Sequence, residues 1–283
     1  LTKEHKLVFF FLIYLFFLFA SSYDIIKKKW WLKVSKVVVI GGGVAGMIAA
    51  IRASLKNEVI LLEGNDKCGK KILLTGNGRC NYWNENISID SYHTDNLKKL
   101  EEIISSSNQK EVLTFLEKMG LFPRIKNGYY YPFSNQAISI QKALILEAEK
   151  QKVKILTDSE VVDILKNEKK FTIVLKNQNK IETDIVVLST GSKAAPKTGS
   201  DGFGYKICEK FKHTVNKPLP ALVQLRANEK YLKDWEGVRA EVSVKLYENE
   251  KEIGKEVGEI QLTNYGVSGI CVFNLSGRVS KGL

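Results

Sequence analysis

Three glycines and one acidic residue are spaced as in a site that binds a dinucleotide. Gly41, Gly43 and Gly46 directly follow an apolar run, and Glu63 ends a second apolar run further along the chain. In that pattern the first glycine permits a tight turn, the second lets the backbone approach a pyrophosphate, and the third brings a helix close to a strand. A carboxylate about 20 residues further on accepts hydrogen bonds from the ribose hydroxyls.

The elements around these residues are those of a βαβ unit. Val37–Ile40 and Val59–Leu62 are unbroken apolar runs, typical of parallel strands that are buried on both faces. Met47–Lys56 reads as the helix between them, and free N–H groups at a helix N-terminus favour phosphates. We therefore predict that Val44 and Ala45, which lie between the glycines, also contact the dinucleotide.

The segment after Glu63 favours FAD over NAD. It is a glycine-rich, cationic loop, whereas an NAD domain normally continues into another short βα unit. Such a loop suits a flavin, whose reduced anion needs nearby positive charge or N–H donors. A plain surface loop is the alternative, but it does not explain why the glycines cluster with Arg79 and Asn81. The acid at Glu63 also disfavours the 2′-phosphate of NADP.

Composition is that of a globular protein with a sizeable core, since 44% of the 283 residues are hydrophobic and 26% are charged. The formal net charge of +12 is compatible with nucleic-acid binding. However, the lysines are scattered along the chain and arginines are few, whereas a nucleic-acid surface gathers both with aromatic residues. We therefore do not expect nucleic acid to be a partner.

Four cysteines are present, with no CxxC pair, and the chain has three histidines. This pattern predicts no metal site and no disulfide framework. Free thiols indicate a reducing compartment, so we expect a cytoplasmic location. Cys68 and Cys80 are the one pair to test for redox activity, because they flank the glycine-rich loop.

Residues 1–33 form an apolar extension with three open interpretations. The run from 7 to 20 is almost wholly apolar and lies between lysines, and extending it to residue 23 gives a marginal membrane-spanning length. It could anchor the chain to the inner face of a membrane, with the lysine-rich flank on the cytoplasmic side. A signal peptide and a dispensable or artefactual extension are the alternatives, and the chain begins with Leu rather than Met.

Further along the chain we predict three short strands, a helix and a second approach to the cofactor. Val153–Leu165, Phe171–Lys176 and Lys180–Leu188 read as a β-meander. Thr190 and Gly191 follow the last apolar run, where the backbone can approach the cofactor again. Asp201 precedes a helix predicted over Tyr205–Lys212, either as a helix cap or as part of a flavin site, and these two interpretations remain open.

Several motifs in order resemble the HI0933/YhiN-like flavoproteins, a family of bacterial FAD-dependent oxidoreductases. They are VVVIGGGVAGMIAA, KKILLTGNGRCN, GYYYPFSNQA, STGSKAAPKTGSDGFGY and GEIQLTNYGVSG. The resemblance covers residues 34–283 and implies an α/β fold, with a Rossmann-like FAD-binding domain of the glutathione-reductase type that carries a β-meander. We expect this domain over 34–215, followed over 216–283 by part of a β-rich insert domain. Strands are expected over Val238–Tyr247, Gly258–Leu262 and Ile270–Leu275.

By this resemblance, the glycines and Glu63 bind the ADP half of FAD, and a second set of residues lies near the flavin: Lys71, Thr75, Gly76, Arg79, Cys80, Asn81, Thr190 and Gly191. Three positions depart from the family's usual pattern. Asn77 replaces the middle glycine of TGGGRCN, Asn264 replaces a histidine, and Ile270 replaces a proline. The family also continues for about a hundred residues more, so we expect this chain to be a C-terminally truncated fragment.

The expected function is transfer of a hydride between a small organic substrate and flavin, with NAD(P)H or O₂ as the second partner. The sequence has no second GxGxxG motif for a dedicated NAD(P)H domain. Arg79, Tyr130 and Tyr131 are candidates for lining the pocket, and no catalytic acid or base is assigned. The alternatives are an FAD-dependent tRNA-modifying protein and a non-catalytic fragment of a flavoprotein.

Overall fold

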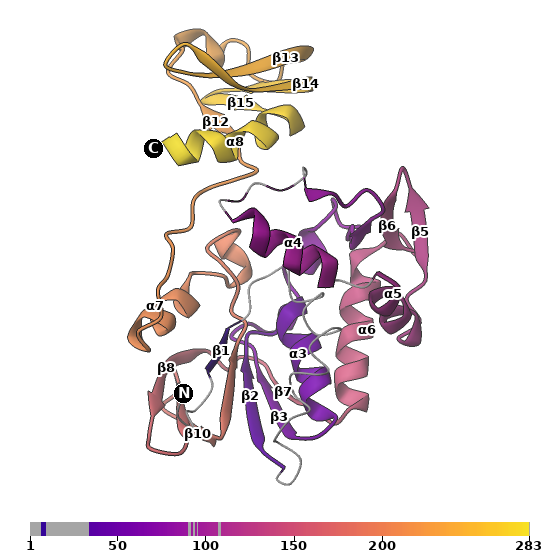
Figure 1. Ribbon diagram of the computed structural model, residues 1–283, viewed down its shortest axis with the longest axis vertical. Coiled ribbons are helices and arrows are strands. Elements are labelled where there is room, and N and C mark those ends of the chain that lie inside the picture. Colours follow the sequence, from indigo (N-terminus) through magenta and orange to yellow (C-terminus); the bar gives the residue numbers. More distant parts are fainter. Residues whose placement is uncertain are drawn as a thin grey trace. The chain divides into compact units, whose positions relative to one another are not determined.

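The computed structural model describes residues 7–9, 34–89, 92, 94, 96–106 and 109–282 (Figure 1). The chain divides into two compact units, Leu1–Val215 and Asn216–Leu283. Among the described residues, the first unit holds three sheets and the second holds one, and each unit has its own buried side chains.

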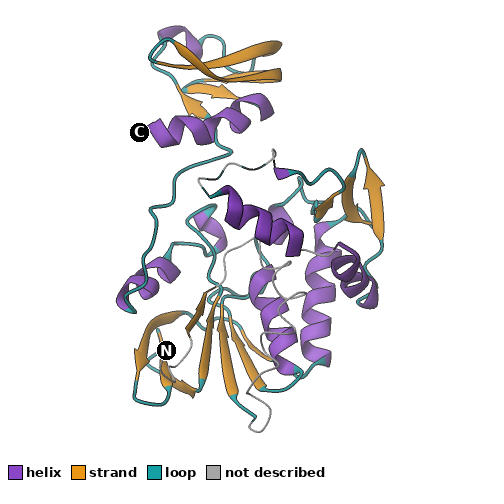
Figure 2. Ribbon diagram, viewed as in Figure 1, coloured by secondary structure: helices purple, strands orange, loops and turns teal. Residues whose placement is uncertain are grey.

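A parallel sheet of five strands organises the first unit (Figure 2). Its order is β1-β11-β2-β3-β7, with bounds Leu7–Phe9, Ile185–Leu188, Lys36–Ile40, Glu58–Leu62 and Lys154–Leu156. Chain order runs outward from β2 through β3 to β7, then resumes on the other side of β2 with β11. This reversal beside β2 is the Rossmann arrangement, and it confirms the predicted α/β fold.

Both faces of this sheet are buried, because each apolar run alternates its side chains between two cores. Val37 and Val39 pack on one face with α3 (Val44–Ser54) and α6 (Ala137–Lys150). Val38 and Ile40 pack on the other face, against the antiparallel strands described below. The unbroken apolar runs of the sequence are therefore explained by burial on both sides.

Further helices belong to the first unit. They include α4 (Leu97–Ser106), α5 (Gln109–Lys118) and the short 3-10 helix η1 (Ile72–Leu74). A small antiparallel sheet has the order β4-β6-β5, with bounds Trp83–Asn84, Tyr129–Pro132 and Pro123–Lys126. Tyr129 to Tyr131 of the GYYYPF motif thus lie on the central strand of this sheet.

The other face carries the predicted β-meander, but two of its three strands were assigned too long. The meander is β8 (Val161–Lys166), β9 (Phe171–Leu175) and β10 (Lys180–Thr183). The prediction for 153–165 merged β7 with β8, which are separated by a turn in which Asp158 has a φ of 48°. The prediction for 180–188 merged β10 with β11. The break comes at Asp184, whose carboxylate accepts the N–H of Lys36 at 2.9 Å as the chain joins the parallel sheet.

The second unit is a four-stranded sheet covered by one helix. The order is β12-β15-β14-β13, with bounds Leu225–Arg226, Gly266–Ser268, Lys251–Thr263 and Arg239–Glu248. A short 3-10 helix, η4 (Lys230–Lys233), precedes β13. The predicted strand Ile270–Leu275 is wrong, because these residues begin α8 (Ile270–Gly282). Cys271, Val272 and Leu275 are buried at helical spacing, so the apolar run forms a helix face rather than a strand.

Most of the N-terminal extension lies outside the described residues. Its backbone is described at β1, which pairs in parallel with β11 through Leu7 and Val186 to Phe9 and Leu188. The proposed anchor or signal segment over 7–23 otherwise falls on residues that are not described. Among the residues that the structure describes, none of the helices is both long and apolar enough to cross a membrane.

Candidate functional site

The glycine-rich turn lies where the order of the parallel strands reverses. It leaves β2 at Gly41, between the carboxyl ends of β3 and β11, and leads directly into α3. A chain that reverses its strand order leaves a crevice at this edge of the sheet, and this is where open α/β sheets bind ligands. The short helix α7 (Phe203–Lys210) follows β11 in the chain after a long loop.

Each of the three glycines has a different structural reason to lack a side chain. Gly41 has a φ of 102°, a conformation that L side chains rarely adopt, and a Cβ there would lie 2.5 Å from the carbonyl oxygen of Ser189. A Cβ on Gly46 would lie 1.8 Å from the carbonyl oxygen of Gly41. Gly43 differs, because a Cβ there would have no described atom of the chain within 4 Å, apart from its neighbours in sequence.

The open space at Gly43 coincides with the N-terminus of α3. Gly43 is the N-cap of this helix, and no described side chain caps it by a hydrogen bond. Val44 and Ala45 form the first turn, which contains no acidic residue. The first N–H groups of a helix have no partner within the helix and carry partial positive charge, so this end suits an anionic group.

The carboxylate of Glu63 is buried and directed at the same turn. Its Oε2 accepts the backbone N–H of Gly42 at 2.8 Å. Its Oε1 accepts the backbone N–H of Asn65 at 2.8 Å and the side-chain Nδ2 of Asn65 at 2.6 Å. A carboxylate has about four acceptor positions, so these three bonds leave room for a further donor. No motif in the sequence singles out Asn65.

The TGNGRC segment is a tight loop with four residues in the left-handed region. Gly76, Asn77, Gly78 and Cys80 have φ values of 55°, 53°, 79° and 61°. Asparagine adopts this conformation more readily than most residues, so Asn77 is compatible with a position where the family usually has glycine. Thr75 donates its hydroxyl to the carbonyl of Ile72 at 2.6 Å, and the segment from 75 to 78 is exposed.

The two cations predicted to lie near the flavin, Lys71 and Arg79, have different surroundings. Lys71 donates from Nζ to the carbonyl of Ala194 and to Oγ of Ser200, both at 2.8 Å, and burial lowers the pKa of Lys71. Arg79 donates from Nε to the carbonyl of Gly76 at 3.1 Å, and its guanidinium lies 5.4 Å from the centre of the Tyr131 ring. Lys71 therefore joins two loops, whereas Arg79 lies against the GYYYPF hairpin.

The remaining predicted residues fall into two groups. Thr190 and Gly191 follow β11 beside the glycine turn, because a Cβ on Gly41 would lie 2.9 Å from the Cα of Thr190. Asn81 is exposed, whereas Tyr130 is buried and donates its hydroxyl to Glu85 at 3.0 Å.

Asp201 accepts the N–H of Phe203 at 2.9 Å. This bond satisfies the N–H of the first residue of α7, while Gly202 is the N-cap, so Asp201 assists the start of the helix from the position before the cap.

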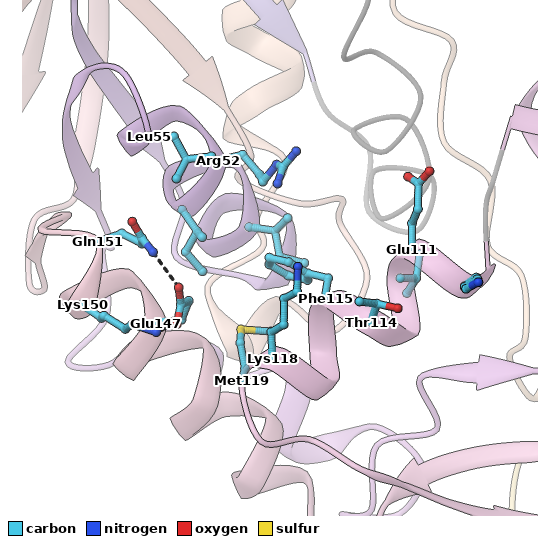
Figure 3. Close-up of a pocket in the computed structure, with 14 residues that line it drawn as sticks. Arg52, Leu55, Glu111, Thr114, Phe115, Lys118, Met119, Glu147, Lys150 and Gln151 are labelled. Carbon is cyan, nitrogen blue, oxygen red and sulfur yellow. Dashed lines mark hydrogen bonds and ion pairs between the residues drawn. The ribbon is translucent and has the colours of Figure 1, made fainter.

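A cavity lies elsewhere on the first unit (Figure 3). It has a volume of about 890 Å³, and side chains of α3, α5 and α6 line it. Arg52 and Leu55 belong to the C-terminal end of α3, one helix length away from the glycine turn. This cavity is therefore separate from the predicted dinucleotide site. Within the described ranges, no group of three or more His, Cys, Asp or Glu side chains is placed to hold a metal ion.

All four cysteines are free thiols, and Cys68 is expected to resist alkylation in the folded chain. Burial and the neighbouring charge of Glu63 raise the pKa of Cys68 from 9.0 to about 12, and burial also raises the pKa of Cys80. At pH 8 a shift of ~3 pH units leaves about 1000-fold less thiolate. Iodoacetamide labelling followed by mass spectrometry should show slow labelling of Cys68 that accelerates as the pH rises.

The control for this prediction is the same labelling in urea, where the thiol regains its ordinary pKa and reacts quickly. Equal labelling rates of Cys68 in the folded and unfolded chain at pH 8 would contradict the buried environment described here.

Comparison with known proteins adds a family and several relatives. The family described as "HI0933-like protein Rossmann domain" matches residues 35–275. A 3-dehydro-bile acid delta(4,6)-reductase of Clostridium scindens is 37% identical over 246 residues, which are 86% of this chain and 60% of that protein. A ribosomal RNA dihydrouridine synthase of Escherichia coli is 28% identical over 243 residues, again 86% of this chain and 60% of that protein.

Among solved structures, a 3-ketosteroid-Δ4-(5α)-dehydrogenase from Rhodococcus jostii RHA1 is 17% identical with a TM-score of 0.43. The match covers 59% of this chain and 48% of that one. The chain thus spans about 60% of the length of the curated relatives that it matches.

Proposed function

The chain belongs to the HI0933-like family, and from this premise we propose that it is an FAD-dependent oxidoreductase acting on a small organic substrate. The observation that supports this most directly is the open space at Gly43, beside the uncapped N-terminus of α3 and the buried carboxylate of Glu63. An anion-binding helix end, a backbone without a side chain and a ribose acceptor together suit the ADP half of FAD.

In this proposal each part of the site binds or orients the cofactor. Gly41, Gly43, Gly46, Val44 and Ala45 receive the pyrophosphate, and Glu63 receives the ribose hydroxyls. The residues proposed for the flavin end are Lys71, Thr75, Gly76, Arg79, Cys80, Asn81, Thr190 and Gly191. When bound, FAD supplies a hydride acceptor and donor, and the chain supplies orientation and electrostatics. No proton donor is assigned.

The substrate we propose is a steroid-like enone. The Clostridium scindens relative, at 37% identity, is named as a reductase of a 3-dehydro bile acid. Reduction of such a carbon–carbon double bond takes a hydride and a proton from two different groups, and NAD(P)H is the proposed source of the electrons. The four free, buried cysteines support a cytoplasmic location for this chemistry.

Ribosomal RNA is a second candidate substrate. The Escherichia coli relative is named as a dihydrouridine synthase of ribosomal RNA, and the net charge of +12 favours a polyanion. Reduction of a uridine double bond is the same class of reaction as reduction of an enone. The tRNA-modifying alternative gains no support from these relatives, since the RNA that they name is ribosomal.

An absorbance spectrum between about 350 and 500 nm tests the cofactor. The purified chain, incubated with FAD and then desalted, is expected to retain flavin absorbance. A folded chain that remains colourless, or one that binds NAD and not FAD, would contradict the proposal.

Anaerobic oxidation of NADPH with a 3-oxo-Δ4 steroid acid, compared with a uridine-containing ribosomal RNA fragment, then discriminates between the two substrates. A chain that binds FAD but reduces neither would be the non-catalytic fragment.

A further inference from the structure

Asn65 holds the ribose-binding carboxylate from the side opposite the glycine turn. We propose that Asn65 is a positioning residue, which orients Glu63 toward the ribose hydroxyls of an adenine dinucleotide. This inference rests on the proposed function, because it assumes that Glu63 receives a ribose. It adds a residue that neither the glycine pattern nor the family resemblance identifies.

The hydrogen bonds of Glu63 show how the carboxylate is fixed. Oε2 is held by the backbone of Gly42 at 2.8 Å, and Oε1 is held twice by Asn65, at 2.6 and 2.8 Å. Each oxygen therefore has a donor from a different segment, so the plane of the carboxylate cannot rotate without breaking a bond. A fixed carboxylate loses little conformational entropy when a ribose arrives, and pre-organisation of this kind raises affinity.

The amide of Asn65 is itself held by its neighbours. Its Oδ1 accepts Lys70 Nζ at 3.2 Å, and its Nδ2 also lies 3.4 Å from the carbonyl of Thr198. An ammonium on one end and a carboxylate on the other permit one orientation of the amide. Gly199 allows this approach, since a Cβ there would lie 2.4 Å from Nδ2 of Asn65.

This contact also joins two loops across the end of β2. Asn65 follows β3, whereas Thr198 and Gly199 follow β11, and β2 with its glycine turn lies between these strands. The two hydrogen bonds from Lys71 to Ala194 and Ser200 reinforce the same connection. The loops on both sides of the site are therefore fixed relative to the turn that is proposed to receive the pyrophosphate.

Replacement of Asn65 by aspartate tests the role through pH. The new carboxylate would lie 2.6 Å from Glu63 Oε1 in place of a donor, so the two acids repel when both are ionised. A shared proton removes this repulsion and restores a hydrogen bond, so the pKa of the pair rises. Other charges face the pair. Lys70, which is paired with Asp66 at 2.7 Å, opposes the rise, whereas the thiol of Cys68 beside Glu63, with a pKa raised to about 12, is neutral at both pH values used below.

The measurement is the Kd for FAD of the wild-type chain and Asn65→Asp at pH 8.0 and pH 5.0. We expect the variant to bind at least tenfold more weakly at pH 8.0 and within about threefold of wild type at pH 5.0. Asn65→Ala, which keeps the backbone donor, is expected to lose affinity by a similar ratio at both pH values. Asn249→Asp, in the exposed β13–β14 turn, controls for net charge, and thermal unfolding confirms that each variant is folded.

A pair of nucleotides separates positioning of Glu63 from general damage to the fold. Asn65→Asp should weaken binding of ADP at pH 8.0, but it should leave binding of 2′,3′-dideoxy-ADP within about twofold of wild type, because that ligand has no ribose hydroxyls. Equal FAD affinities of wild type and Asn65→Asp at pH 8.0, or equal losses for both nucleotides, would overturn the inference alone. A wild-type chain that binds neither FAD nor ADP would overturn the proposed function and the inference together.

Discussion

Replacing Gly46 with alanine is expected to destabilise the first unit by about 3 kcal/mol or more and to abolish FAD binding. The added Cβ would lie 1.8 Å from the carbonyl oxygen of Gly41 and 2.7 Å from Oγ of Ser189. Neither neighbour can move freely, since Gly41 starts the turn and Ser189 donates both its N–H and its hydroxyl to the carbonyl oxygen of Ile40, each at 2.8 Å. The helix must therefore move away from the sheet, which also displaces its N-terminus from the proposed pyrophosphate site.

Urea denaturation followed by circular dichroism measures this loss, and Gly64→Ala is the matched control. Gly64 lies at the same edge of the sheet, but a Cβ there would have its nearest neighbour at 3.6 Å, an ordinary contact. The control should unfold within about 0.5 kcal/mol of wild type. If Gly46→Ala unfolded at the same urea concentration as Gly64→Ala, the close packing of α3 on β2 would be wrong.

The sequence predicted the parts of the candidate site that depend on local geometry. Gly41 and Gly46 are specified by a strand that turns directly into a helix, and this pattern occupies a few consecutive residues. Local patterns failed where a short apolar run was compatible with either a strand or a helix. Ile270–Leu275 was assigned to a strand, yet the buried residues Cys271, Val272 and Leu275 show the spacing of a helix face. The short length of the run hid this spacing.

Contacts between distant loops could not be predicted, because they depend on the order of strands in the sheet. Asn65 and Lys71 contact the segment from 194 to 200, and nothing in their immediate sequence indicates this. The separation of β7 from β8, and of β10 from β11, was missed for a related reason. Polar residues mark both breaks, Thr157–Glu160 in the first run and Asp184 in the second, but the sheet that the chain then joins depends on distant partners such as Lys36.

Replacing Gly43 with alanine is expected to leave the fold intact and to weaken FAD binding by at least 100-fold. Gly43 has φ −70° and ψ −178°, a conformation that alanine adopts readily, and the added Cβ would meet no described atom within 4 Å beyond its sequence neighbours. Alanine is a poorer N-cap than glycine, but it lowers the entropy of the unfolded chain. These effects oppose each other, so the free energy of unfolding should change by less than about 1 kcal/mol.

The loss of affinity in Gly43→Ala has a separate cause from the loss in Gly46→Ala. The new methyl group projects into the space where the pyrophosphate is proposed to approach the backbone, so it excludes the ligand without displacing the helix. Fluorescence titration with FAD, alongside the urea measurement, distinguishes the two variants. Gly43→Ala is expected to lose FAD affinity alone, whereas Gly46→Ala is expected to lose both FAD affinity and stability. A Gly43→Ala chain that binds FAD as tightly as wild type would show that the ADP half lies away from this turn, and the proposed site would be wrong.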